Sequence, residues 1–178
     1  DLARKNPDIE FFLIGGPGTE PDQQALWKRV RAEAVKIGNL TLMGHVHYSE
    51  ISGVLRTASV LVNTSDHEGF PNTFLEAWAS GIPTVSFVGL DAGNNTPFPG
   101  IRVANIDEMA SEVRRLLTDK SVWNESSKHC VMTFKKYFEF SAVADDYRRL
   151  FDGLVAEMPT QAGEQPMAAS DADKRGLP

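Results

Sequence analysis

One segment shows the order of strands and helices most clearly; it runs from Ser59 to Val88 and reads SVLVNTSDHEGFPNTFLEAWASGIPTVSFV. It opens with a predicted strand at residues 59–65, which contains the apolar Val60-Leu61-Val62, and closes with another at residues 84–88. Between them, residues 73–80 can form two helical turns, with Asn72 as the N-cap residue and Gly81 and Pro83 ending the helix. A strand, a short helix and a strand in this order predict a βαβ unit with parallel strands.

The alternation of strands and helices continues on both sides of this unit. Strands are predicted at residues 9–16, 40–44 and 101–104. Helices are predicted at residues 21–38 (ended by Gly38), 49–58 (begun by Ser49), 106–119, 121–138 and 140–158. We therefore expect an α/β protein with a Rossmann-like, doubly wound parallel sheet.

The first residues of the chain bear on the completeness of this sheet. Residues 1–7 have the character of the tail of a helix that precedes a strand. A doubly wound sheet usually begins with its central strand. We therefore expect the sheet to lack its first strand, and the chain to be a piece of a longer protein.

Length and composition indicate one folded domain with a tail. The chain has 178 residues, and its hydrophobic fraction of 42% and charged fraction of 24% are ordinary for a globular protein. Residues 159–178 are rich in Pro, Ala, Gly and charge, which predicts a disordered tail. The folded domain is expected to span residues 1–158.

Charge and cysteine content narrow the partners and the compartment. The net charge of −6 and the pI of about 5.2 argue against a nucleic-acid surface, which is usually basic. The single cysteine, Cys130, cannot form an internal disulfide, so a reducing, cytoplasmic location is predicted. No apolar run approaches the ~20 residues of a membrane span, and association with a membrane surface is left open.

Two carboxylates, Glu68 and Glu76, flank the predicted start of the helix at residues 73–80. The free N–H groups of Thr73, Phe74 and Leu75, together with the helix dipole, form a site suited to a phosphate. Glu76 lies roughly 6 Å along the helix and could accept hydrogen bonds from ribose hydroxyls. Phe74, Leu75 and Trp78 lie on another face, which we expect to point toward the core. Glu68 lies in the loop on the other side and could accept from a second sugar. The pattern suits a ligand of the form sugar–diphosphate–ribose.

Exposed glutamates are more often merely solvated, so this pair alone is weak evidence. The intervening Gly69-Phe70-Pro71-Asn72 strengthens it, because Gly69 permits close backbone approach or a positive φ and Pro71 stiffens the loop. Metal ligation is not expected, since His45 and His47 lack partners at zinc spacing.

The segment EGFPNTFLEAWASGIPTV, residues 68–85, closely resembles the signature of the retaining glycosyltransferases of family 4, which have the GT-B fold. That signature has a glutamate, seven residues and a second glutamate, and ends in Glu-Ala-x-Ala-x-Gly-x-Pro-Val. The resemblance extends from Asn6 to Tyr147 and includes NPDIEFFLIGGPG, LTLMGHV and LRTASVLVNTSDHEGF. It implies that the chain is the C-terminal, donor-binding half of a GT-B fold.

The resemblance implies roles for individual residues. Glu68 would contact the donor sugar as the catalytic-site carboxylate, and Glu76 would hold the ribose. The diphosphate and sugar would be lined by Gly69, Phe70, Pro71, Asn72, Thr73 and Phe74. The base would lie near Gly44, His45 and Val46, and the pocket would be bordered by Gly15 and Gly16.

The implied reaction transfers a sugar, with retention, from a UDP- or GDP-linked donor to an acceptor, without a metal or other cofactor. Relatives stabilise the departing diphosphate with an Arg and a Lys, which would precede Asp1, and hold the acceptor in an N-terminal domain. The chain alone is therefore expected to be inactive.

The sequence departs from the family pattern at two places. Thr84 stands where Val is usual, and the segment at residues 88–100 lacks the glutamate of the usual Gly-Gly-x-x-Glu loop, which makes Asn94 and Asn95 uncertain as ligand contacts. Alternatives are a non-catalytic nucleotide-binding or regulatory module, or a sugar epimerase or phosphorylase of the same fold. A nicotinamide-binding domain is disfavoured, because IGGPGTEPDQ does not have the Gly-x-Gly-x-x-Gly spacing.

Overall fold

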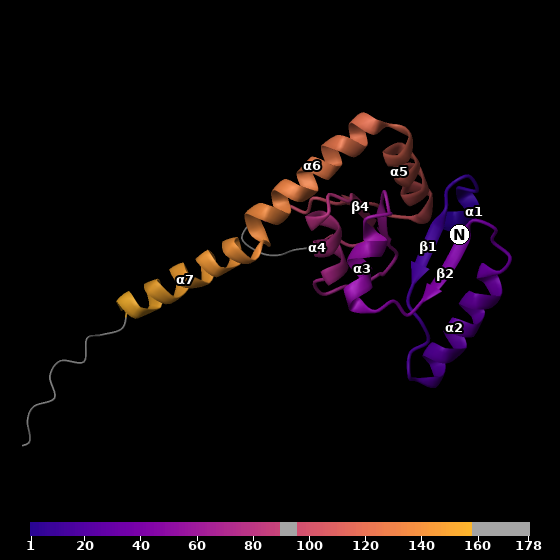
Figure 1. Ribbon diagram of the computed structural model, residues 1–178, viewed down its shortest axis with the longest axis horizontal. Helices are drawn as coiled ribbons and strands as arrows, with labels where there is room; N and C mark the ends of the chain where they lie inside the picture. The colour runs from indigo at the N-terminus through magenta and orange to yellow at the C-terminus, as the bar shows by residue number, and fades with distance from the viewer. Residues whose placement is uncertain (90–95, 158–178) are drawn as a thin grey trace, which may run out of the picture. The chain divides into compact units, whose positions relative to one another are not determined.

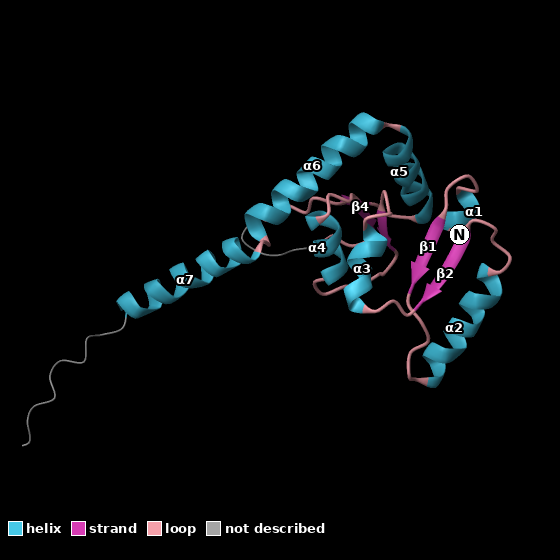
Figure 2. Ribbon diagram, viewed as in Figure 1, coloured by secondary structure: helices cyan, strands magenta, loops and turns pink. Residues whose placement is uncertain are grey.

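A computed structural model describes residues 1–89 and 96–157 of the chain (Figures 1 and 2). The predicted contacts of Asn94 and Asn95 and the predicted disordered tail at 159–178 lie outside the described residues. Two compact units are present, residues 1–143 and a second that begins at Ala144. The elements, in chain order, are α1 (Leu2–Lys5), β1 (Phe11–Ile14), α2 (Pro21–Ala34), β2 (Leu40–Gly44), α3 (Tyr48–Leu55), β3 (Leu61–Asn63), α4 (Asn72–Ala79), β4 (Thr84–Ser86), β5 (Ile101–Arg102), α5 (Ile106–Thr118), α6 (Lys120–Tyr137) and α7 (Phe140–Glu157).

All strand pairs are parallel, as the βαβ pattern predicts. β1 pairs with β2, and β4 lies between β3 and β5. Within the described strands β1 and β3 are not paired, and a cleft of about 740 Å³ is lined by residues of both. A doubly wound sheet has its first strand at this position, between the second and the fourth. The predicted α/β architecture with an incomplete sheet is therefore confirmed.

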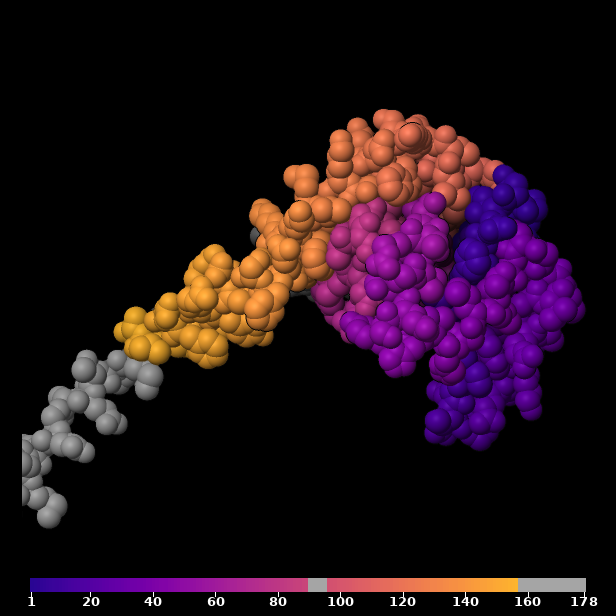
Figure 3. Space-filling view, viewed as in Figure 1, coloured from indigo at the N-terminus to yellow at the C-terminus, as the bar shows by residue number. Residues whose placement is uncertain are grey.

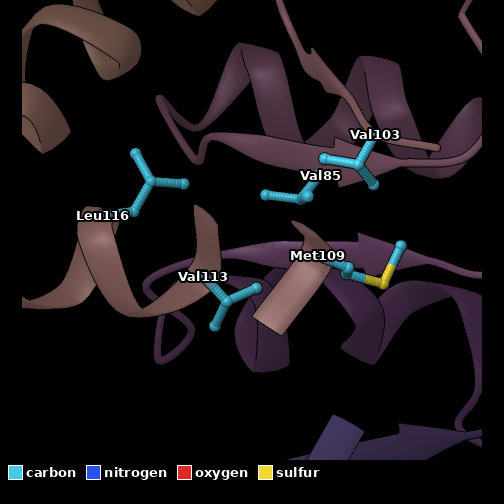
Figure 4. Packing of buried hydrophobic residues seen from close by; sticks show 5 residues of the cluster. All are labelled: Val85, Val103, Met109, Val113 and Leu116. Atoms are coloured by element: carbon cyan, nitrogen blue, oxygen red, sulfur yellow. The ribbon is translucent and has the colours of Figure 1, made fainter. Parts of the chain in front are cut away.

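Helices cover both faces of the β3-β4-β5 sheet. On one face, Met109, Val113 and Leu116 of α5 pack on Val85 of β4 and on Val103 (Figure 4). On the other face, Leu55 of α3 packs with Ala77 of α4 and with Ile82. Val85 of β4 faces α5, whereas its neighbour Thr84 accepts a hydrogen bond from Trp78 of α4, because side chains alternate along a strand.

The third cluster joins α4 to α6 and contains the buried residues Phe74, Trp78 and Cys130. α6 lies against α4, and the space-filling view shows its orange side chains against the magenta region that includes α4 (Figure 3). Burial raises the pKa of the Cys130 thiol to about 12, so this cysteine is a packing residue.

Some predicted boundaries and burials differ from the structure. β1 is not fully buried: Phe12 and Ile14 are exposed and line the cleft between β1 and β3. α2 ends at Ala34, so Gly38 lies beyond the helix and is not its stop. α3 is capped by His47, whose Nδ1 accepts from the N–H of Ser49, and not by Ser49. None of the helices within residues 1–89 and 96–157 is long and apolar enough to cross a membrane.

Candidate functional site

The candidate residues gather where the parallel strands end. Gly15 and Gly16 follow β1, and Gly44 ends β2. The loop at residues 64–71 follows β3 and leads into α4. The cleft between β1 and β3 reaches this edge, where Ile14, Asn63 and Thr73 line it. In open α/β sheets this carboxyl edge is where ligands bind.

The ends of β1 and β2 are held together by their backbones. The N–H of Gly15 donates to the carbonyl of Gly44 at 2.8 Å. Both glycines have positive φ, +135° and +71°, which L side chains rarely adopt. A Cβ at Gly16 would collide with the His45 ring, so the ring lies directly over this glycine.

A second cavity of about 520 Å³ opens beside Gly16, Gly44 and His45. Its opposite wall is formed by α2, through Trp27 and Arg31. His45 is exposed and Val46 is half-buried. The turn after β2 therefore presents backbone and an exposed ring beside a hollow, which fits the predicted role of residues 44–46 but does not test it.

The Glu68 carboxylate is oriented by a residue that the sequence reasoning missed. The side-chain amide of Asn63 donates to Glu68 Oε1 at 2.9 Å, and Asn63 Oδ1 accepts from the N–H of Ser65 at 2.8 Å. Hydrogen bonds from Asn63 and from the Ser65 side chain lower the pKa of Glu68. The exposed Glu68 is thus an ionised acceptor held at the mouth of the loop. The sequence signal for Asn63 is its position as the last residue of β3.

The start of α4 differs by one residue from the prediction. Pro71 is the N-cap residue and Asn72 is the first helical residue, without a side-chain cap hydrogen bond. The N–H of Phe74 donates to the carbonyl of Pro71 at 3.0 Å. It is therefore not free for a ligand, and the prediction that it would be was wrong. The prediction of Asn72 as N-cap was wrong because Pro71 already has the extended backbone, φ −71° and ψ 116°, that an N-cap requires.

The two faces of α4 are those that the spacing predicts. Phe74 and Trp78 are fully buried, whereas Asn72 and Thr73 are exposed and Glu76 is half-buried. Trp78 Nε1 donates to Thr84 Oγ1 at 3.1 Å in the core. This bond gives a physical reason for Thr84 where the family usually has Val, because the buried indole N–H needs an acceptor.

Gly69 has neither neighbours nor a left-handed backbone. A Cβ there would meet no atom within 4 Å, and its φ is not positive. The suggested positive φ was therefore wrong, while the room for close approach of a ligand is present.

Across residues 1–89 and 96–157, no group of three His, Cys, Asp or Glu side chains is placed to hold a metal ion.

Part of the chain is similar in sequence to a curated protein. Mannosylfructose-phosphate synthase from Agrobacterium fabrum is 27% identical over 88 residues, which are 47% of this chain and 19% of that protein. The chain therefore spans less than a fifth of this curated relative.

Solved structures of similar fold include the following three. Sucrose-phosphate synthase from Thermosynechococcus elongatus superimposes with a TM-score of 0.69 at 22% identity, over 87% of this chain and 41% of that one. HepE from Anabaena, solved with UDP, superimposes with a TM-score of 0.68 at 16% identity, over 87% of this chain and 44% of that one. The C-terminal domain of LpcC, a group 1 glycosyl transferase from Francisella tularensis, superimposes with a TM-score of 0.60 at 14% identity, over 79% of this chain and 94% of that domain.

These likenesses identify the fold as that of the C-terminal domain of GT-B glycosyltransferases, as the sequence predicts. The family described as "Glycosyl transferases group 1" matches residues 1–119, which is most of the first compact unit. The chain therefore belongs to the group 1 glycosyl transferases.

Proposed function

We propose that this domain binds the nucleotide diphosphate sugar donor of a retaining glycosyltransferase. The observation that carries the proposal is the loop between β3 and α4, where an oriented carboxylate, Glu68, stands beside the exposed first turn of a helix. HepE, which shares the fold, was solved with UDP, and this supports a nucleotide as the ligand.

The diphosphate would lie at the start of α4. The N–H groups of Asn72 and Thr73 belong to the first helical turn and have no acceptor within the helix. These groups and the positive end of the helix dipole attract an anion. Gly69 has open space beside it and would let the ligand approach the loop backbone closely.

The two carboxylates would then bind hydroxyl groups on either side of the phosphates. Glu68 would accept from the sugar while Oε1 also accepts from Asn63, because an ionised carboxylate offers about four acceptor sites. Glu76 lies one turn into α4 and would accept from the ribose. Neither carboxylate would contact phosphate, because like charges repel.

Transfer to an acceptor is proposed for the whole protein and not for this domain alone. The matched structures of full enzymes are covered only to 41–44%, so other parts of such proteins complete them. We propose that an N-terminal domain holds the acceptor and that turnover requires it, with the leaving diphosphate stabilised by cationic groups and no metal or cofactor.

The test is calorimetric titration of the folded domain with UDP, GDP and ADP and with the matching sugar nucleotides. Glu76→Gln should weaken binding of the preferred nucleotide ~10-fold or more. Glu68→Gln should weaken the sugar nucleotide but leave the nucleotide alone unchanged. The matched control is Glu10→Gln, an exposed glutamate just before β1 and therefore at the opposite edge of the sheet.

Two outcomes would contradict the proposal. One is equal affinity of the parent and Glu76→Gln for the nucleotide. The other is a folded domain, verified by circular dichroism, that binds none of the three nucleotides.

A further inference from the structure

Five aromatic rings join the Glu68–Pro71 loop to the interior of the domain. Phe74 and Trp78 of α4 are fully buried, and each lies close to Phe98, with ring centroids 6.1 and 5.8 Å away. Phe138, at the end of α6, lies 5.8 Å from Trp78. Phe70, in the loop, lies 5.4 Å from Phe138. The cluster thus runs from an exposed loop to a buried helix.

Phe70 reaches this cluster through Phe138. Within the described residues, Phe138 is the ring that Phe70 contacts, at an interplanar angle of 53°. Phe70 is 42% exposed, so more than half of its surface is covered, and the Phe138 ring lies against it. Tilted aromatic pairs at such separations are favourable beyond the area that they bury.

Phe138 is itself held firmly. Phe138 is the C-cap residue of α6, and its N–H donates to the carbonyl of Phe134 at 2.8 Å. The N–H of Glu139 donates to the same carbonyl at 2.9 Å. α6 is fixed to the domain by the buried Cys130 and Thr133. The ring that supports Phe70 therefore stands on a packed element rather than on a second loop.

The loop has one anchor on each side of Gly69. Before it, Glu68 is bonded to Asn63, and after it, Phe70 rests on Phe138. Gly69 itself has nothing within 4 Å of where a Cβ would be. We infer that Phe138 is a positioning residue, which acts through Phe70 to hold the loop in the conformation that receives the donor. This inference rests on the proposed donor site.

The experiment compares Phe138→Leu with Phe138→Tyr in the domain. Leucine keeps an apolar side chain but removes the ring, whereas tyrosine restores the ring. We expect Phe138→Leu to speed amide hydrogen exchange of residues 65–72 and to weaken binding of UDP- or GDP-glucose, each about three- to tenfold. Phe138→Tyr should behave as the parent.

The matched control is Phe98→Leu. Phe98 contacts Phe74 and Trp78 in the same cluster, but no ring contact between Phe98 and Phe70 is seen in the described part of the chain. Phe98→Leu should change the midpoint of urea unfolding without a selective change of amide hydrogen exchange in residues 65–72. If Phe138→Leu alters the loop no more than Phe98→Leu does, the inference is wrong.

The two readouts separate this inference from the proposed function. If the parent binds the donor, and Phe138→Leu changes neither hydrogen exchange nor affinity, only the role of Phe138 is overturned. The parent could instead bind no nucleotide, while exchange of residues 65–72 is still faster in Phe138→Leu and normal in Phe138→Tyr. That result overturns the donor site but supports the role of Phe138 in holding the loop.

Discussion

At the scale of single residues, Asn63 decides how Glu68 is presented. One amide side chain donates to the carboxylate and accepts from the backbone of Ser65, so it fixes both the loop and the acid. A hydrogen bond to the ionised form favours that form, which is why the pKa of Glu68 is lowered. Sequence reasoning identified the glutamate but not the residue that orients it.

Asn63→Ala should raise the pKa of Glu68, because the largest cause of its lowering is removed. A carboxyl whose pKa is lowered by folding adds stability at neutral pH that is lost as the pH falls through its folded value. The variant should lose part of that acid-side dependence. Carbon-detected NMR titration of the Glu68 carboxyl measures the change.

Thr64→Ala, at an exposed neighbour, is the control for this titration. Binding of the sugar nucleotide should weaken ~3- to 10-fold in Asn63→Ala and not in the control. An unaltered Glu68 titration in Asn63→Ala would show that the amide does not set the acid's charge.

At the scale of elements, α4 is defined by how it ends. Gly81 has φ +71° and its N–H donates to the carbonyl of Trp78, while the N–H of Ile82 donates to that of Ala77. These two bonds form a Schellman motif, which requires a left-handed residue at the position of Gly81. The Gly-Ile-Pro sequence predicts this helix end, and the structure confirms it.

Gly81→Ala should destabilise the domain by ~1–2 kcal/mol, the cost of a left-handed backbone for an L residue. The added Cβ would also lie 2.9 Å from Ser127 Oγ, so this hydroxyl would have to move. Urea unfolding followed by circular dichroism measures the loss.

Gly69→Ala provides the contrast, because that glycine has open space and no positive φ. Its stability should stay within ~0.5 kcal/mol of the parent, while donor binding weakens if the ligand approaches the loop backbone. Equal destabilisation by the two substitutions would mean that the backbone at residue 81 is not strained by a side chain.

At the scale of the whole molecule, an ion pair joins positions far apart in the chain. Arg114 of α5 binds both carboxylate oxygens of Asp8, at 3.0 and 2.6 Å. Asp8 stands just before β1, so the pair ties the start of the chain to α5. The Arg114 hydrogen bonds lower the pKa of Asp8 to about 2.

Arg114→Gln should raise the pKa of Asp8, followed by NMR, because the largest cause of its lowering is removed. The lowered pKa means that the pair stabilises the fold at neutral pH and stops doing so as the pH falls from ~4, the unfolded value, through about 2. The effect on stability should be small, because both groups are exposed.

Arg115→Gln is the control, since Arg115 pairs with Glu112 only three residues away on the same helix. It should leave Asp8 unchanged. An Asp8 carboxyl that titrates alike in the parent and in Arg114→Gln would show that the pair is not formed in solution.

Sequence patterns alone predict the order of strands and helices, the bounds of β2, the end of α4 at Gly81 and the family. These features rest on the alternation of apolar residues, on glycine and proline at fixed places, and on one motif, all of which are local. The buried face of α4 followed for the same reason, from the spacing of Phe74 and Trp78.

Only the tertiary structure decided which residues cap α3 and α4, that Phe12 and Ile14 face a cleft, and that Phe138 supports Phe70. A cap depends on the backbone angles of one residue, which composition does not specify. A contact between residues 70 and 138, or 8 and 114, leaves no periodic trace in the chain, because it exists only after distant elements have packed together.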